Sequence, residues 1–219
     1  NDPPIAVNDE YTVNEDTELT GNVNVLDNDS DVDSGTLTTV VIDAVSNGTL
    51  TLNSDGTFNY TGTNNFNGSD NFTYQLNDGA GGLDTATVSI TVTAVNDSPV
   101  LTSIGNQFTN EDSDSTITLS ATDVDIATNS QTLSFIATSD TESLVKVSTT
   151  SGDGSGSGTL TFDVQKDQNG TAQITVTVKD SEDSTHAETF ILTVRAVNDS
   201  PVLTSIGIQF TNEDTDSTI

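Results

Sequence analysis

The chain has 219 residues, enough for two domains of about 100 residues each. Its 34 acidic residues outnumber Lys and Arg, of which there are 4, and the net charge of −30 disfavours binding to nucleic acid phosphates or anionic lipids. No apolar stretch approaches the roughly 18 residues of a membrane span, so we expect no membrane insertion. The chain lacks cysteine, which excludes disulfides and thiolate metal sites.

Residues 1–95 alternate between apolar and polar side chains with a period of two, which is typical of β-strands. In chain order we expect strands at 38–42, 49–52, 57–60, 71–76 and 86–92. Asn47-Gly48, Asp55-Gly56 and Asp78-Gly79 suit tight hairpin turns between them. This alternation argues against the intrinsic disorder that such an acidic composition would otherwise allow.

Residues 96–197 repeat the same rhythm, and no stretch has a convincing helical period. The expected strands lie at 133–136, 144–147, 160–164, 172–178 and 190–194. About seven short strands per 100 residues is typical of an immunoglobulin-like β-sandwich. We therefore predict an all-β chain of tandem immunoglobulin-like, Greek-key sandwiches.

An internal repeat sets the expected domain limits. Segment 94–117 recurs at 196–219, 102 residues later, and only positions 106 and 113 differ from their later counterparts. A weaker copy opens the chain at Asn1-Asp2-Pro3-Pro4. We predict domains at 1–95 and 96–197, with 198–219 as the linker and first strand of a truncated third repeat. That last segment would be extended or would pair with an edge strand of another copy.

The acidic residues gather where an up-and-down sandwich would place its linkers and end loops. At the junction between the two domains we expect metal ligands from both: Glu15, Asp16, Asn67, Asp70, Asn96, Asp97, Asp123, Asp125 and Asp180. The next junction would use Glu111, Asp112, Asp167, Asn169, Asn198 and Asp199. The N-terminal pole would hold half of such a site, formed by Asn1, Asp2, Asp31, Asp33 and Asp78.

Carboxylates from neighbouring domains that converge in this way are unstable unless cations lie between them. Oxygen ligands without His or Cys select a hard ion, and six to eight of them in flexible geometry favour Ca²⁺ over Mg²⁺. The spacing Asp31-x-Asp33 and Asp123-x-Asp125 puts two carboxylates on one face of an extended loop. The alternative is surface charge that only keeps the protein soluble.

Three segments resemble the cadherin-like repeats of large bacterial surface adhesins, the group with tandem-95 and VCBS-type domains. They are Val25-Leu26-Asp27-Asn28-Asp29-Ser30-Asp31-Val32-Asp33, Phe66-Asn67-Gly68-Ser69-Asp70-Asn71-Phe72-Thr73-Tyr74 and Ala94-Val95-Asn96-Asp97-Ser98-Pro99. The resemblance implies a cadherin-like fold, a secreted or cell-surface location within a longer polypeptide, and calcium at the linkers. It implies that role for Glu15, Asp70, Asn96, Asp97, Asp123, Asp125 and Asp180.

The expected function is a calcium-rigidified extracellular spacer or adhesion module whose partners are calcium ions and neighbouring repeats. The alternative is calcium-dependent binding of cell-surface glycans or of another adhesin copy. Tyr60 and Tyr74 lie in strand patterns and are expected in the core, which leaves few aromatic platforms for a sugar. His186 is the only histidine and is expected on the surface, so we predict no enzyme.

Overall fold

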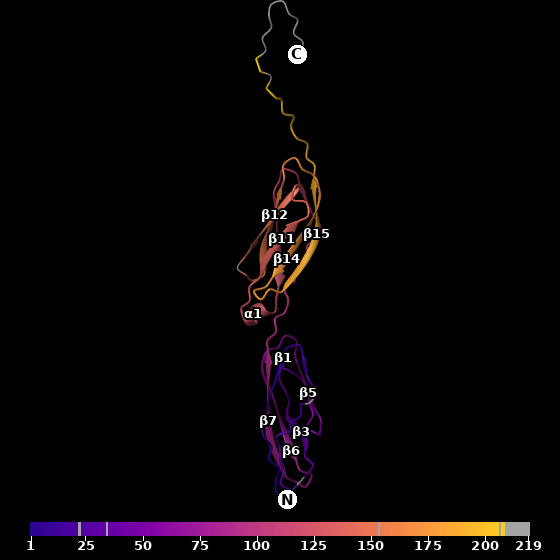
Figure 1. Cartoon of the computed structure of the whole chain (residues 1–219), viewed down its shortest axis with the longest axis vertical. Coiled ribbons are helices and arrows are strands. Elements are labelled where there is room, and N and C mark those ends of the chain that lie inside the picture. The colour runs from indigo at the N-terminus through magenta and orange to yellow at the C-terminus, as the bar shows by residue number, and fades with distance from the viewer. Residues whose placement is uncertain (22, 34, 153, 206, 209–219) are drawn as a thin grey trace, which may run out of the picture. The chain divides into compact units, whose positions relative to one another are not determined.

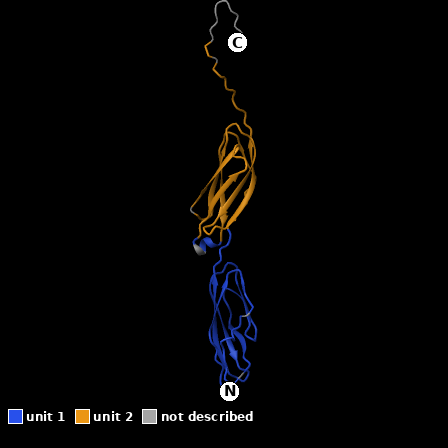
Figure 2. Cartoon of the chain, in the orientation of Figure 1, with its two compact units in different colours: residues 1–98, 124–130 blue, residues 99–123, 131–219 orange. Residues whose placement is uncertain are grey.

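The computed structural model describes residues 1–21, 23–33, 35–152, 154–205 and 207–208. The chain divides into two compact units, each described by itself (Figure 2). Unit 1 comprises residues 1–98 and 124–130, and unit 2 comprises residues 99–123 and 131–219. Residues 198–205 and 207–208 form no strand, and the rest of the predicted third-repeat segment lies outside the described residues.

Unit 1 is a sandwich of a four-stranded and a three-stranded sheet (Figure 1). Its strands are β1 (Asp9–Asn14), β2 (Glu18–Leu19), β3 (Thr38–Asp43), β4 (Gly48–Leu52), β5 (Phe58–Gly62), β6 (Gly68–Asn77) and β7 (Leu83–Thr93). The order is β1-β7-β6-β3 in one sheet and β2-β5-β4 in the other. The first strand pairs in parallel with the last, and the other pairs are antiparallel.

The core of unit 1 is aromatic. Tyr60, Tyr74 and Phe72 are fully buried, and Phe58 is 1% exposed. Phe58 packs edge-to-face against Phe72 at 5.4 Å and against Tyr11 at 5.1 Å between ring centroids. Each such pair adds about 0.5–1.5 kcal/mol to the burial term, so a few large rings hold two small sheets together.

Unit 2 is a sandwich of two four-stranded sheets. Its strands are β8 (Val100–Leu101), β9 (Gln107–Asn110), β10 (Ser115–Thr122), β11 (Ser134–Ser139), β12 (Val145–Ser151), β13 (Ser157–Val164), β14 (Gly170–Lys179) and β15 (Thr185–Arg195). The order is β12-β13-β10-β8 in one sheet and β11-β14-β15-β9 in the other. The predicted all-β sandwich is therefore confirmed in both units.

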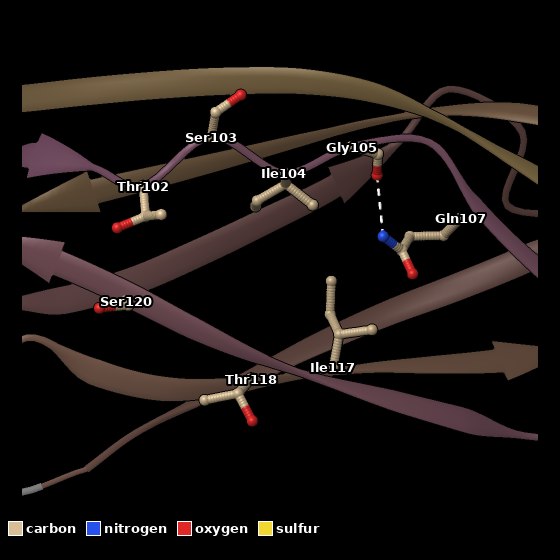
Figure 3. A pocket seen from close by; sticks show the side chains of 8 residues that line it. All are labelled: Thr102, Ser103, Ile104, Gly105, Gln107, Ile117, Thr118 and Ser120. Carbon is tan, nitrogen blue, oxygen red and sulfur yellow. Dashed lines mark hydrogen bonds between the residues drawn. The ribbon is translucent and has the colours of Figure 1, made fainter.

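The first strand of unit 2 is split between the two sheets. β8 pairs antiparallel with β10, whereas β9 pairs in parallel with β15. The stretch that connects β8 to β9 lies beside a hollow of about 200 Å³, whose lining includes Ile104 and Ile117 (Figure 3). Within this stretch the Gln107 amide donates a hydrogen bond to the Gly105 carbonyl at 2.8 Å. None of the eight residues that line the hollow is titratable or aromatic.

Two expectations about local structure were wrong. Residues Asp125–Asn129 form a short helix, α1, so the Asp123-x-Asp125 segment is not an extended loop. Asn47-Gly48 is no hairpin turn, because β3 and β4 belong to different sheets. Gly48 is instead required by close packing, since a Cβ there would lie 2.4 Å from the carbonyl oxygen of Thr61. Asp55-Gly56 does close a hairpin, with Gly56 at a φ of +84°.

Candidate metal centre

The turn after β1 ties the end of unit 1 to the segment that leaves it. Glu15 is 4% exposed, and its backbone N–H donates to the carbonyl of Thr93 at 2.9 Å. Its Oε1 accepts the N–H of Val95 at 2.7 Å, and its Oε2 accepts the side-chain amide of Asn67 at 3.3 Å. One carboxylate thus holds together the first turn, the β5–β6 loop and the exit segment.

Unit 2 builds the same arrangement from closely matching segments. Glu111 is 5% exposed and its N–H donates to the carbonyl of Arg195 at 2.9 Å. Its Oε1 accepts from the N–H of Val197 at 2.7 Å and its Oε2 from the Asn169 amide at 3.3 Å. The distances match those at Glu15, so we call this arrangement the Glu clamp in both units.

The residue after each clamp glutamate adopts a left-handed backbone conformation. Asp16 and Asp112 have φ values of 56° and 59°, and the loop residues opposite them, Asn65 and Asp167, have 57° and 56°. Asp and Asn tolerate this region better than other non-glycine residues. In each unit the turn Asp accepts the N–H of the opposite loop residue, at 2.9 Å in unit 1 and 3.0 Å in unit 2. Both turns therefore present carboxylate or amide oxygens at fixed positions.

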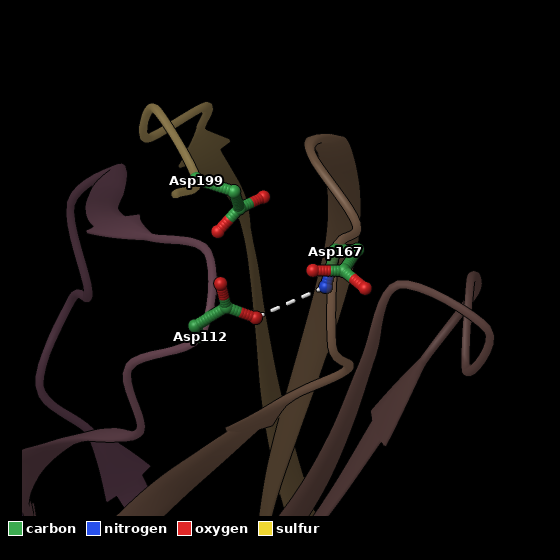
Figure 4. Close-up of side chains that lie close together, drawn as sticks. All are labelled: Asp112, Asp167 and Asp199. Carbon is green, nitrogen blue, oxygen red and sulfur yellow. Dashed lines mark hydrogen bonds between the residues drawn. The ribbon is translucent and has the colours of Figure 1, made fainter. Parts of the chain in front are cut away.

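Three carboxylates meet at the end of unit 2, as Figure 4 shows. Oxygen atoms of Asp112, Asp167 and Asp199 all lie within 4.8 Å of one another, and all three residues are exposed. They come from the first turn, the β13–β14 loop and the exit segment. Desolvation, followed by the negative charges of Asp112 and Asp167, raises the pKa of the Asp199 carboxyl. The residues present fit a hard cation, because every side-chain donor in the group is an oxygen.

The N-terminal pole of unit 1 brings together the five residues expected there. The Asn1 amide donates to Asp78 at 2.7 Å, the N–H of Asp2 donates to Asp33 at 2.7 Å, and the N–H of Asp33 donates to Asp31 at 2.7 Å. Hydrogen bonds from Asn1 and from backbone N–H groups of its own loop lower the pKa of the Asp78 carboxyl. The pole therefore concentrates carboxylate and amide oxygens.

The residues expected around the linker fall into both units. In unit 1, the N–H of Asp97 donates to Asp125 at 2.8 Å, Asp125 is 1% exposed, and Asn96 is half-buried. In unit 2, Asp123 is half-buried, and Asp180 accepts the N–H groups of Glu182 and Ser184, both at 2.8 Å. Asp180 therefore holds the β14–β15 loop as Asp78 holds the β6–β7 loop. Asn198 is exposed beside Asp199.

Asp70 has a role in the fold that the sequence interpretation missed. It is 3% exposed and accepts the N–H groups of Ser46, Asn47 and Asn71 at 2.8–3.0 Å and the hydroxyl of Tyr60 at 3.1 Å. Burial alone would raise its pKa, but these hydrogen bonds outweigh burial and leave the pKa below its usual value. Asp70 therefore stabilises the fold of unit 1 by accepting four hydrogen bonds.

His186 is half-buried rather than on the open surface. It lies near the start of β15, and its Nδ1 accepts the N–H of Leu101 at 2.9 Å. The imidazole thereby fixes β8, which otherwise has only two paired residues. This hydrogen bond gives His186 a structural role.

The aromatic side chains offer little for a sugar to stack on. Tyr60 and Tyr74 are fully buried, as predicted. Phe108 is 60% exposed, but the Arg195 guanidinium lies 4.9 Å from its ring centroid and covers one face. The described residues therefore give no specific support to glycan binding.

Comparison with known families decides the domain types. Residues 1–94 match the bacterial cadherin-like domain, and residues 96–193 match the bacterial Ig domain. The chain is a bacterial cadherin-like domain followed by a bacterial Ig domain. The predicted family resemblance is confirmed by these two matches. A search of curated proteins found no match.

Solved structures show the same fold in cadherins. Human CDH23 EC21-23 has a TM-score of 0.58 at 15% identity, with 88% of this chain and 69% of that chain covered. Mouse Cadherin-23 EC22-24 has a TM-score of 0.53 at 15% identity, with 89% and 67% covered. The chain spans only 29% of the endo-fucoidan hydrolase MfFcnA4, and that likeness, with a TM-score of 0.37, carries no argument.

These domain types indicate an extracellular adhesion or spacer module. Cadherin-like domains generally bind calcium, and cadherin-like and Ig-like domains are typically not enzymes. Among the described residues, no helix is both long and apolar enough to cross a membrane.

Proposed function

We propose that the cadherin-like and Ig pair is a calcium-rigidified spacer and adhesion module of a larger repeat-containing surface protein. Calcium would bind at the ends of the sandwiches, where linkers leave, and the module would perform no catalysis. The observation that carries the proposal is the group of Asp112, Asp167 and Asp199, whose carboxylate oxygens lie within 4.8 Å of one another.

The Glu clamp supports the same role at the linker after unit 1. Glu15 fixes the backbone at Val95, and Asp97 follows two residues later, within about 7 Å of extended chain. The clamp therefore keeps linker oxygens close to the turn of Glu15 and Asp16. In unit 2, Asp123 and Asp180 remain proposed calcium ligands. The proposed ligands at the N-terminal pole are Asn1, Asp2, Asp31, Asp33 and Asp78.

Calcium would act here by neutralising like charges that otherwise repel. Without it, a linker flanked by several carboxylates is a hinge that favours separation of the acids. Extracellular modules bind calcium with a Kd of about 10⁻⁴–10⁻³ M, so millimolar calcium fills them. At tenfold excess over Kd each ion adds about 1.4 kcal/mol, and several ions would fix a linker angle.

Calcium-dependent stiffness is tested by small-angle scattering of the whole chain in millimolar calcium and in chelator. We expect calcium to narrow the distribution of interatomic distances and chelator to broaden it. Asp112→Asn should lower the number of bound calcium ions in equilibrium dialysis, and Glu142→Gln, an exposed acid outside the proposed ligand set, should leave it unchanged. An identical distance distribution in both buffers would contradict the spacer mechanism.

A further inference from the structure

A buried aspartate inside unit 1 lacks any visible counter-charge. Asp9 is the first residue of β1, it is 8% exposed, and its Oδ2 is buried without a hydrogen-bond partner. The first 145 residues of the chain contain no Lys, Arg or His, so no basic side chain of unit 1 can pair with it. Side-chain hydrogen bonds from Asn28 and Tyr74 favour the charged form of Asp9, but burial and the neighbouring carboxylates outweigh them. A buried carboxylate without a counter-charge is costly, which calls for a cation or a proton.

The surroundings of Asp9 supply further oxygens. Asp29 accepts the N–H of Val7 and the hydroxyl of Tyr74, both at 2.8 Å, so the segment 25–30 runs beside the segment that leads into β1. The Tyr74 hydroxyl also contacts the carbonyl of Val25 at 3.2 Å. Asp27 is exposed on the same segment.

The electrostatics agree with this grouping. Burial, then the negative charge of Asp29 and that of Asp27, raises the pKa of Asp9 to about 7. Burial also raises the pKa of Asp29. Burial, followed by the charges of Asp9 and Asp27, raises the pKa of Tyr11 to about 12. Asp9, Asp29 and Tyr11 thus lie in one region where burial and negative charge disfavour ionisation.

We propose that unit 1 binds a calcium ion within the domain, on Asp9, Asp27 and Asp29, separate from the ions of the linkers. At the pole Asp33 accepts the N–H of Asp2 and Asp31 accepts that of Asp33, whereas Asp29 accepts the hydroxyl of Tyr74, so the two sets have different partners. Carboxylate oxygens select a hard ion, and flexible coordination favours calcium. Among the described residues the Asp112 group alone has three carboxylates within 4.8 Å, so Asp27 or Asp29 would close onto Asp9 as the ion binds.

Unit 2 provides an internal control because it lacks these side chains. The clamp glutamates align Asp9 with Gly105, and the paired Asp-x-Asp segments align Asp27 and Asp29 with Leu119 and Ala121. The strand registers align Tyr74 with Val176. The proposed internal site therefore belongs to the cadherin-like unit alone, although both units share the Glu clamp.

The test uses the whole chain and its tyrosines, all three of which, Tyr11, Tyr60 and Tyr74, lie in unit 1 and report its unfolding. Asp9→Asn removes the charge and keeps the shape, and Glu10→Gln is the matched control on the exposed side of β1. In chelator Asp9→Asn should unfold at or above the wild-type midpoint, whereas in millimolar calcium the wild type should be the more stable. Native mass spectrometry should show one calcium ion fewer for Asp9→Asn.

Asp27→Asn tests the same site at an exposed position. The calcium ion inside unit 1 should bind to this variant about tenfold more weakly than to the wild type. Asp112→Asn should lose a linker ion yet keep the calcium response of the tyrosine signal, which separates this proposal from the spacer function. An unchanged ion count in Asp9→Asn would overturn the internal site. The site would also be overturned if Asp9→Asn were the more stable protein with and without calcium, since Asp9 would then hold a proton.

Discussion

The two units share their ends and differ in their interiors. Each ends in a Glu clamp with the same hydrogen bonds, at Glu15 and at Glu111. Inside, unit 1 buries Asp9 and Asp70, where unit 2 has Gly105 and Ala172. Four basic side chains and the histidine are found in the sequence, all after residue 145. The shared part is therefore the linker geometry, and the charge inside each sandwich varies independently of it.

The largest expected effect comes from the buried network that unit 2 lacks. Asp70→Ala leaves the Tyr60 hydroxyl and three N–H groups without their acceptor, at a cost to unit 1 of about 3 kcal/mol or more. Tyrosine fluorescence during denaturant unfolding measures this change. A loss below about 1 kcal/mol would show that the network contributes little and would weaken the contrast between the units.

Lowering the pH should weaken the hydrogen-bond network around Asp70. Because the folded-state pKa of Asp70 is depressed, its stabilisation is fully present above its unfolded pKa of about 4 and is lost as the pH falls through the lower folded value. The free energy of unfolding of unit 1 is compared between wild type and Asp70→Asn from about pH 5 to pH 2. This comparison isolates the part of the acid sensitivity that Asp70 causes. The difference in the free energy of unfolding between the two proteins should decrease as the pH falls.

Paired clamp variants test whether the two ends work alike. Glu15→Gln and Glu111→Gln keep an amide oxygen for the N–H of Val95 or Val197 but remove one negative charge. Each should weaken calcium binding at its own end by about tenfold, equivalent to about 1.4 kcal/mol. Calorimetric titration measures the loss. Strongly unequal effects would mean that the identical hydrogen bonds do not reflect identical metal sites.

The smallest effect is expected at the split first strand of unit 2. His186→Phe fills the same space but cannot accept the N–H of Leu101, at a cost of about 1 kcal/mol. Hydrogen exchange should speed up at Leu101 and Thr102, and the core of unit 1 should be unaffected. Unchanged protection at Leu101 would show that pairing with β10 alone holds β8.

The period of two predicted the long strands well, because inward positions in β6, β7, β14 and β15 are regular runs of buried side chains. The same alternation also marks two aspartates as inward-facing, which was overlooked because aspartate is usually exposed. Asp70 shares the inward face of β6 with Phe72 and Tyr74, and Asp9 shares that of β1 with Val13. An aspartate in phase with buried residues indicates a role inside the domain.

Other features depend on tertiary contacts that no local pattern encodes. The division of the first strand into β8 and β9 depends on which sheet each half joins, and α1 has only five residues, too few for a helical period. The grouping of turn, loop and exit acids was predictable because the repeat fixes their spacing. Whether these groups bind calcium remains a prediction.

The parallel pairing of first and last strands has a mechanical consequence. β1 runs beside β7 over six residue pairs, and β9 beside β15 over four. Since parallel neighbours point the same way, traction on the incoming chain before β1 and on the outgoing chain after β7 pulls the two strands in opposite directions along their length. Their interstrand bonds are then loaded together in shear, instead of being peeled apart one by one. Each module should therefore resist stretching most strongly along the direction in which its neighbours would pull.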